Sequence, residues 1–145
     1  MDGTGLEAGF DAAYAPDRVL RDGEAIAVDG RPVVAVATPG HTSNHLCFAF
    51  GDALLSGDHV MGWSTTVVVP PDGDMAEYMR SLDKLRQRDD RVYYPAHGPP
   101  VTNPKQYVRH LIGHRMRQTF LVEMRDPMSS ACSTVHTRFF TTCAF

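Results

Sequence analysis

One construction occurs three times in this sequence and constrains its fold more than any other feature. A short apolar segment ends at small turn-forming residues, and a His or an Asp comes next. The segments span residues 33–36, 53–55 and 92–94, and the polar residues beyond them are His41, Asp58 and His97. Pro and Gly mark the junctions, so each segment reads as a strand that ends where the polar side chain is presented. If the strands share one sheet, their ends gather these side chains at one edge, where α/β proteins usually place their sites.

The three side chains are candidate metal ligands, because neutral imidazole and carboxylate suit zinc, iron or manganese. His45 lies four residues beyond His41, on a turn that leads into a strand, so the spacing does not place both rings on one face. We therefore expect His45 to hydrogen-bond a ligand rather than to bind the metal. We expect His59 to be a neighbour of Asp58 and not a ligand.

Each of these residues also has an ordinary structural interpretation. A single His after a Pro-Gly turn is more often a solvated loop residue than a ligand, and Asp58 follows Gly57 as turn residues often do. Trp63 is predicted either to line a pocket or, as is commoner for Trp, to pack in the core. Ser56 and Thr42 lack the nucleophile-elbow pattern, which argues against hydroxyl catalysis. The three motifs together favour descent from a metal site.

The motifs TPGHT, SGD and PAHG, in this order and spacing, resemble the third, fourth and fifth motifs of the metallo-β-lactamase superfamily. The similarity covers roughly residues 17–117 and is greatest to the branch with hydroxyacylglutathione hydrolases and lactamase-B-like ribonucleases. It implies two zinc ions, bound separately by His41 and His97 and bridged by Asp58. The family's His-x-His-x-Asp-His motif, which supplies four further ligands from the N-terminal half, is not in this sequence.

The resemblance implies an α/β fold: the C-terminal half of an αββα sandwich, with a mixed sheet and helices on one face. A second sheet covers the other face in the intact fold, so we expect an exposed apolar face here. The hydrophobic pattern predicts strands at residues 25–28, 32–37, 45–50, 53–55, 65–69 and 91–94. It also predicts a helix that begins after Asp74 and ends near residue 88, and a last helix that begins at Asn103-Pro104.

Two details sharpen this prediction. Asp29-Gly30 joins the first two strands as a tight hairpin, because such turns need positive φ angles. The two helices are expected to bury apolar side chains that recur at helical spacing. These are Met75, Tyr78, Met79, Leu82 and Leu85 in the first helix, and Val108, Leu111 and Ile112 in the last.

The 145 residues are enough for one modest domain. We predict an irregular N-terminal segment (1–16), a metallo-β-lactamase-like half domain (17–124) and a disordered Ser/Thr-rich tail (125–145). The net charge is −3 and basic residues are not interleaved with aromatic ones, so nothing indicates nucleic acid as a partner. The sequence shows no signal peptide or membrane-spanning run, and its three cysteines lack paired spacing, which together favour the cytoplasm.

The resemblance implies a zinc-dependent hydrolase, in which a metal-bound hydroxide attacks a small-molecule ester or thioester, or a phosphodiester. His41, Asp58 and His97 supply about two ligands per ion, so we expect water, a second copy or a separate N-terminal half to complete the site. An alternative is a catalytically inert fragment that acts at most as an interaction module. A third interpretation places all three residues on one iron ion.

Overall fold

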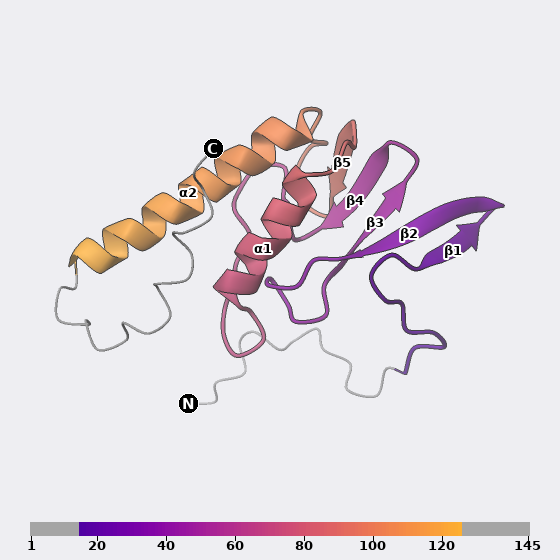
Figure 1. The fold of residues 1–145 in the computed structure, drawn as a ribbon, viewed down its shortest axis with the longest axis horizontal. Coiled ribbons are helices and arrows are strands. Elements are labelled where there is room, and N and C mark those ends of the chain that lie inside the picture. The colour runs from indigo at the N-terminus through magenta and orange to yellow at the C-terminus, as the bar shows by residue number, and fades with distance from the viewer. Residues whose placement is uncertain (1–14, 126–145) are drawn as a thin grey trace.

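The computed structural model describes residues 15–125, with side chains described to residue 118. Residues 1–14 and 126–145 lie outside the described residues, and the irregular segment and the disordered tail predicted there stay predictions. The elements, in chain order, are β1 (Ala25–Val28), β2 (Arg31–Ala37), β3 (Leu46–Phe50), β4 (Ala53–Gly57), α1 (Met75–Arg86), β5 (Val92–Pro95) and α2 (Pro104–Arg125) (Figure 1).

The strands form one mixed sheet in the order β1-β2-β3-β4-β5. The first three pairs are antiparallel and β4 pairs with β5 in parallel, so α1 is the crossover between two parallel neighbours. Asp29 and Gly30 have φ angles of 49° and 72°, as the predicted tight hairpin requires. The predicted α/β fold with a mixed sheet is thereby confirmed.

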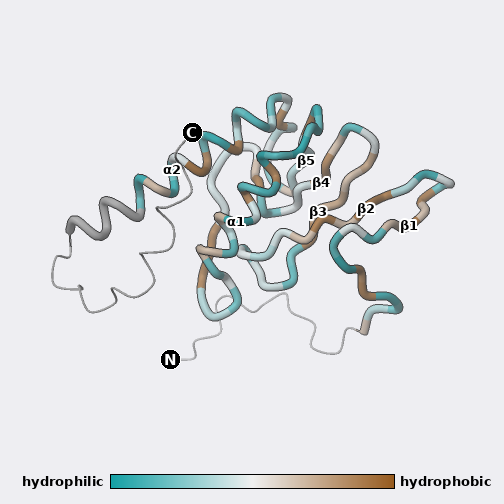
Figure 2. Tube along the Cα trace, in the orientation of Figure 1, coloured by the Kyte–Doolittle hydropathy of each residue, from teal (hydrophilic) through white to brown (hydrophobic). Residues whose placement is uncertain are grey.

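Both helices pack on one face of the sheet. Asp74 caps α1 by accepting a hydrogen bond from the Glu77 amide, and the apolar side chains of α1 then recur toward the sheet. The buried core consists of Val36, Cys47, Ala49, Leu54 and Tyr93 from the strands, Tyr78, Leu82 and Leu85 from α1, Val108 and Leu111 from α2, and Val60 and Val101 from loops. In Figure 2, apolar colour follows β2 and β3, whereas much of α1 and α2 is hydrophilic.

One member of the predicted helical stripe is not buried. Met75 is 37% exposed. It is the first residue of α1, and that end of the helix lies against the loop after β2, where the Asp74 amide donates to the Gly40 carbonyl at 2.9 Å. The helix therefore begins beside this loop and not over the sheet, which leaves its first apolar residue outside the core.

The opposite face of the sheet is also apolar, and no described helix or strand covers it. Phe48 pairs with Leu55, and Leu55 pairs with Tyr94, so these side chains share that face. Leu55 is 49% exposed, Tyr94 45% and Phe50 36%. We call Phe48, Phe50, Leu55 and Tyr94 the open face. It agrees with the expectation of an exposed apolar face.

The prediction of a strand at residues 65–69 is wrong, because this β-branched run lies in the loop between β4 and α1. Its backbone groups bond to side chains instead of a neighbouring strand. The Val67 carbonyl accepts from His41, and the Thr66 carbonyl accepts from Arg115. Trp63 of the same loop is 73% exposed, so it does not pack in the core.

Candidate metal centre

The structure brings His41, Asp58 and His97 together at the ends of their strands. His41 Nε2 lies 3.9 Å from Asp58 Oδ2, and His97 Nε2 lies 3.4 Å from Asp58 Oδ1. The parallel pairing of β4 with β5 accounts for part of this arrangement. Gly57 pairs with Pro95 at the ends of these two strands, so Asp58 and His97 leave the sheet side by side. The carboxylate of Asp58 therefore stands between two imidazoles, with a different oxygen toward each.

The environment of Asp58 suits a cation. Both gaps to the imidazole nitrogens are longer than a good N–H···O hydrogen bond. Asp58 Oδ1 is shielded from solvent and has no hydrogen-bond partner among the described residues. A shielded carboxylate oxygen without a donor is unfavourable, and a bound cation would remove that cost. The residues present thus fit a metal ion held between Asp58 and its two neighbours.

The hydrogen bond of His41 fixes its tautomer. Nδ1 of His41 lies 2.6 Å from the Val67 carbonyl oxygen. A carbonyl only accepts hydrogen bonds, so Nδ1 carries the proton and a neutral ring keeps its lone pair on Nε2. That nitrogen is the one that faces Asp58. This backbone contact prepares His41 to act as a ligand, as carbonyl partners of metal-bound histidines commonly do.

A single loop segment, residues 62–67, contacts all three candidate ligand positions. The Gly62 amide donates to the His97 carbonyl at 2.9 Å, and the Thr66 hydroxyl donates to the Asp58 carbonyl. The third contact is that of Val67 with His41. Thr66 itself is buried, at 2% exposed. The run predicted to be a strand, residues 65–69, therefore overlaps the segment that ties the three positions together.

His45 lies beside His41 and is partly buried. Its Nδ1 is 2.8 Å from the Thr38 hydroxyl, and the ring centroids of His45 and His41 are 6.2 Å apart. Burial lowers the pKa of His45, which favours the neutral ring. The hydrogen bond goes to Thr38, not to a candidate ligand, so a supporting role of His45 in the site stays a prediction.

His59 is fully buried behind the site, and both its ring nitrogens lack hydrogen-bond partners among the described residues. Its ring packs between those of His45 and Tyr78, at centroid distances of 5.5 and 4.7 Å. Burial lowers the pKa of His59 to about 3, so the ring is neutral near pH 7. From the sequence we expect only a neighbour of Asp58; the complete burial of His59 is a finding of the structure.

Tyr78 holds two of the ligand-bearing loops, a role that the sequence does not reveal. Its hydroxyl donates to the His59 carbonyl at 3.2 Å, next to Asp58. Its backbone packs against Gly40, next to His41, where an added Cβ would lie 2.2 Å from the Tyr78 nitrogen. Gly40 also has a φ of 131°, so glycine is required there for two reasons. The helical pattern identified Tyr78 as a core residue but carried no sign of these contacts.

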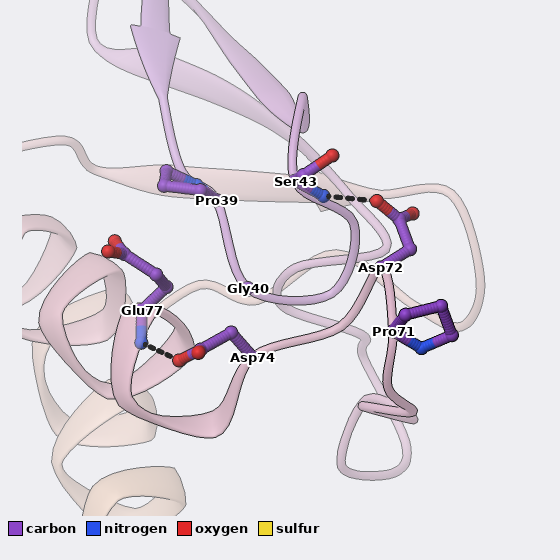
Figure 3. A pocket seen from close by; sticks show the side chains of 7 residues that line it. All are labelled: Pro39, Gly40, Ser43, Pro71, Asp72, Asp74 and Glu77. Carbon is purple, nitrogen blue, oxygen red and sulfur yellow. Dashed lines mark hydrogen bonds between the residues drawn. The ribbon is translucent and has the colours of Figure 1, made fainter.

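An open cleft of about 420 Å³ lies between the loop that carries Gly40 and Ser43 and the start of α1 (Figure 3). It is lined by Pro39, Gly40, Ser43, Pro71, Asp72, Asp74 and Glu77. Two of its carboxylates accept backbone hydrogen bonds: Asp72 from the Ser43 amide at 3.0 Å and Asp74 from the Glu77 amide at 2.8 Å. The hydrogen bond between Ser43 and Asp72 connects this loop to the segment before α1. None of the three candidate ligands lines the cleft.

The candidate centre has few protein ligands for each metal position. Among residues 15–118, whose side chains are described, no group of three or more His, Cys, Asp or Glu side chains is arranged to hold one ion. This argues against a single iron on all three residues and leaves Asp58 shared between two positions.

No helix in the described part of the chain is long and apolar enough to cross a membrane.

A mixed sheet that gathers two imidazoles and a carboxylate at its strand ends, with both helices on one face, defines the class: an α/β protein with a candidate metal centre at one edge of its sheet. A family model described as "Metallo-beta-lactamase superfamily" matches residues 2–97. The chain belongs to this superfamily.

Individual relatives agree with this assignment. The chain is 38% identical to an atrochrysone carboxyl ACP thioesterase of Aspergillus fumigatus, over 72% of this chain and 34% of the relative. A metallo-beta-lactamase family protein of Thermus thermophilus has a TM-score of 0.69 at 28% identity, over 73% of this chain and 37% of that one. TTHA1623, solved in a di-iron-bound form, has a TM-score of 0.54 at 26% identity, over 64% and 46%. The chain spans about a third of the length of the curated relative it matches.

Proposed function

We propose that this chain provides part of the active site of a metal-dependent hydrolase. His41 and Asp58 would hold one ion, and Asp58 and His97 the other. The observation that carries this proposal is the placement of Asp58, whose two oxygens face the Nε2 atoms of different histidines at 3.9 and 3.4 Å. Zinc is the proposed metal, because imidazole and carboxylate ligands suit it. The di-iron form of TTHA1623 makes iron the alternative to test.

A bound divalent ion lowers the pKa of a coordinated water and polarises the oxygen of the bond to be cleaved. The residues of this chain orient the ligands for that chemistry. Val67 fixes the tautomer of His41, and the Thr66 hydroxyl holds the backbone of Asp58. We propose an ester, thioester or phosphodiester substrate, and we place thioesters first because one relative is named as an acyl-carrier thioesterase.

Two protein ligands per ion are fewer than the three that catalytic zinc usually has. We propose that the remaining ligands come from a separate N-terminal half or a second copy of this chain that packs on the open face. Leu55 and Tyr94 of that face lie on the two strands that lead to Asp58 and His97. A partner seated there would reach both the apolar surface and the metal centre.

We also propose a cytoplasmic location, because the spacing of the three cysteines does not indicate disulfide pairs.

A second candidate is an inert fragment that acts only as an interaction module. The same low ligand number favours it, together with the exposure of the open face. In that case the arrangement around Asp58 is inherited, and the chain alone does not retain metal.

Metal content separates the two candidates. The purified chain is dialysed against trace zinc and analysed by elemental analysis beside Asp58→Ala and Asp89→Ala. Asp89 is the matched control, because its side chain is 91% exposed and pairs with Lys105. We expect close to stoichiometric zinc in the parent chain and in Asp89→Ala, and loss of most of it in Asp58→Ala. Equal zinc in all three would contradict the assigned ligands, and a folded parent chain without zinc would exclude completion of the site by a second copy and favour the inert fragment.

A further inference from the structure

We propose that Trp63 and Val67 form an apolar wall beside the metal centre, and that this wall binds an aromatic acyl group of the substrate. The inference rests on the proposed function, since a hydrolytic centre gives the wall its substrate. It adds a binding surface, and a chemical class of ligand, to a site so far defined only by its candidate metal ligands.

The wall is fixed next to the centre by its backbone. Residues 62–67 are hydrogen-bonded to all three candidate ligand positions, with Gly62 on His97 at one end and Val67 on His41 at the other. Between them, buried Thr66 is held by Asp58 and Arg115. The backbone positions of Trp63 and Val67 are therefore fixed, so a ligand would lose little free energy in ordering this loop.

The side chains that leave this segment toward solvent are large and apolar. Trp63 is 73% exposed and Val67 is 62% exposed. A Cβ added to Gly98 would lie 2.8 Å from Trp63 Cδ1, so the indole stands directly against the residue that follows His97. The backbone carbonyl of Val67 contacts His41, so the Val67 side chain leaves the segment at the His41 end. The two apolar side chains thus mark the His97 end and the His41 end of the same centre.

The chemistry of the wall selects a neutral aromatic group. Residues 61–69 read MGWSTTVVV and contain no charged side chain, so nothing in the segment would pair with a charged substituent. The wide indole surface favours offset or edge-to-face contact with another ring, and a β-branched neighbour adds a stiff apolar boundary. An aryl group next to the scissile carbonyl would be buried against Trp63 while that carbonyl faces the metal ligands.

Trp63 also provides the test, because it is the only tryptophan of the chain. The zinc-dialysed chain is titrated with the benzoyl and the acetyl thioester of N-acetylcysteamine, and tryptophan emission is followed. Ligand-observed saturation-transfer NMR gives affinities for the parent chain and for Trp63→Ala, Trp63→Phe, Met116→Ala and Leu55→Ala. Met116 is a matched control, 61% exposed on α2, and Leu55 reports on the open face.

We expect the benzoyl thioester to change Trp63 emission saturably and to bind between about twofold and tenfold more tightly than the acetyl thioester. Trp63→Ala should abolish this preference, Trp63→Phe should retain most of it, and the two controls should keep it. Equal affinities in the parent chain, or a preference that survives Trp63→Ala, would overturn the proposal. A preference lost in Leu55→Ala instead would assign the ligand to the open face, which also overturns it.

Failure of the wall and failure of the proposed function give different results. Zinc is measured on the same samples. Zinc retained without a benzoyl preference overturns the wall and leaves the metal centre standing. A Trp63-dependent preference without zinc supports the wall as a binding surface and overturns a hydrolytic centre formed by this chain alone or by two copies of it.

Discussion

The two faces of the sheet are built from the same strands, yet their surroundings differ completely. On one face Leu54 and Tyr93 are buried under α1 and α2, at 0% and 1% exposed. On the other, their chain neighbours Leu55 and Tyr94 are 49% and 45% exposed. Side chains alternate along a strand, so adjacent residues of similar hydrophobicity end up in a core and at a surface. An apolar strand predicts two apolar faces, but only the packing of the rest of the molecule decides which one is covered.

The candidate metal centre lies at the ends of β4 and β5, the strands that carry residues of both the covered and the open face. α1 supports it from the covered side, through Tyr78 on the loops of Asp58 and His41 and through the Ser81 hydroxyl on the Pro39 carbonyl at 2.8 Å. No described element supports it from the open side. This asymmetry explains how the centre can be well ordered around Asp58 and still have too few ligands.

The largest expected effect of a substitution is on the covered face. Leu82 is fully buried between α1 and the sheet. Leu82→Ala should lower the free energy of unfolding by about 2–5 kcal/mol, because it removes buried methyl groups and leaves a cavity. Leu55→Ala, the same change on the open face, should cost less than about 1 kcal/mol, since much of that side chain is already in water. Urea unfolding followed by circular dichroism measures both, and equal losses would show that the open face is covered in solution.

The second effect is a pH dependence that originates on the covered side. His59 is neutral when folded, and its pKa falls from an ordinary 6.5 to about 3 because it is buried. Between these two pKa values the unfolded chain binds a proton at His59 that the folded chain does not bind. The contribution of His59 to the free energy of unfolding is therefore fully present above pH 6.5 and decreases as the pH falls toward 3. At pH 5 the loss from this residue should be about 2 kcal/mol.

Unfolding by urea at pH 7.5 and at pH 5 tests this sign. His59→Leu should flatten the dependence, whereas His110→Gln, at an exposed histidine of α2, should leave it unchanged. A parent chain that is equally stable at both pH values would contradict the neutral, buried state of His59. An unaltered slope in His59→Leu would assign the effect to another group, with partly buried His45 as the next residue to replace.

The sequence was sufficient where structure is decided locally. Asp29-Gly30 set a hairpin, Asp74 capped α1, and the strand ends carried His41, Asp58 and His97 to one place. Each of these features depends on a few neighbouring residues or on a strand's direction. Such patterns also identified the strands and the two helices, whereas the fold class was implied by the resemblance of the three motifs to the superfamily.

The errors have one physical origin, which is contact between distant segments. The run at 65–69 has the composition of a strand, but its carbonyls bond to His41 and Arg115, which are 26 and 49 residues away from their partners. The core position, the commoner one for Trp, is excluded for Trp63 by its exposure, which follows from the placement of that loop. The contacts of Tyr78 with two ligand-bearing loops also join segments that no local pattern connects.

The substitution expected to change stability least, Leu55→Lys, tests whether the open face is an association surface. If this face is an association surface, Leu55→Lys should abolish concentration-dependent self-association in sedimentation velocity, because a charge there would have to be desolvated in the interface. Its effect on the free energy of unfolding should stay below about 1 kcal/mol, since Leu55 is 49% exposed. Met116→Lys, at an exposed apolar residue of α2, should associate as the parent chain does. Association that survives Leu55→Lys but is lost in Met116→Lys would move the contact to the helices, and the two faces would then differ in packing but not in their need for a partner.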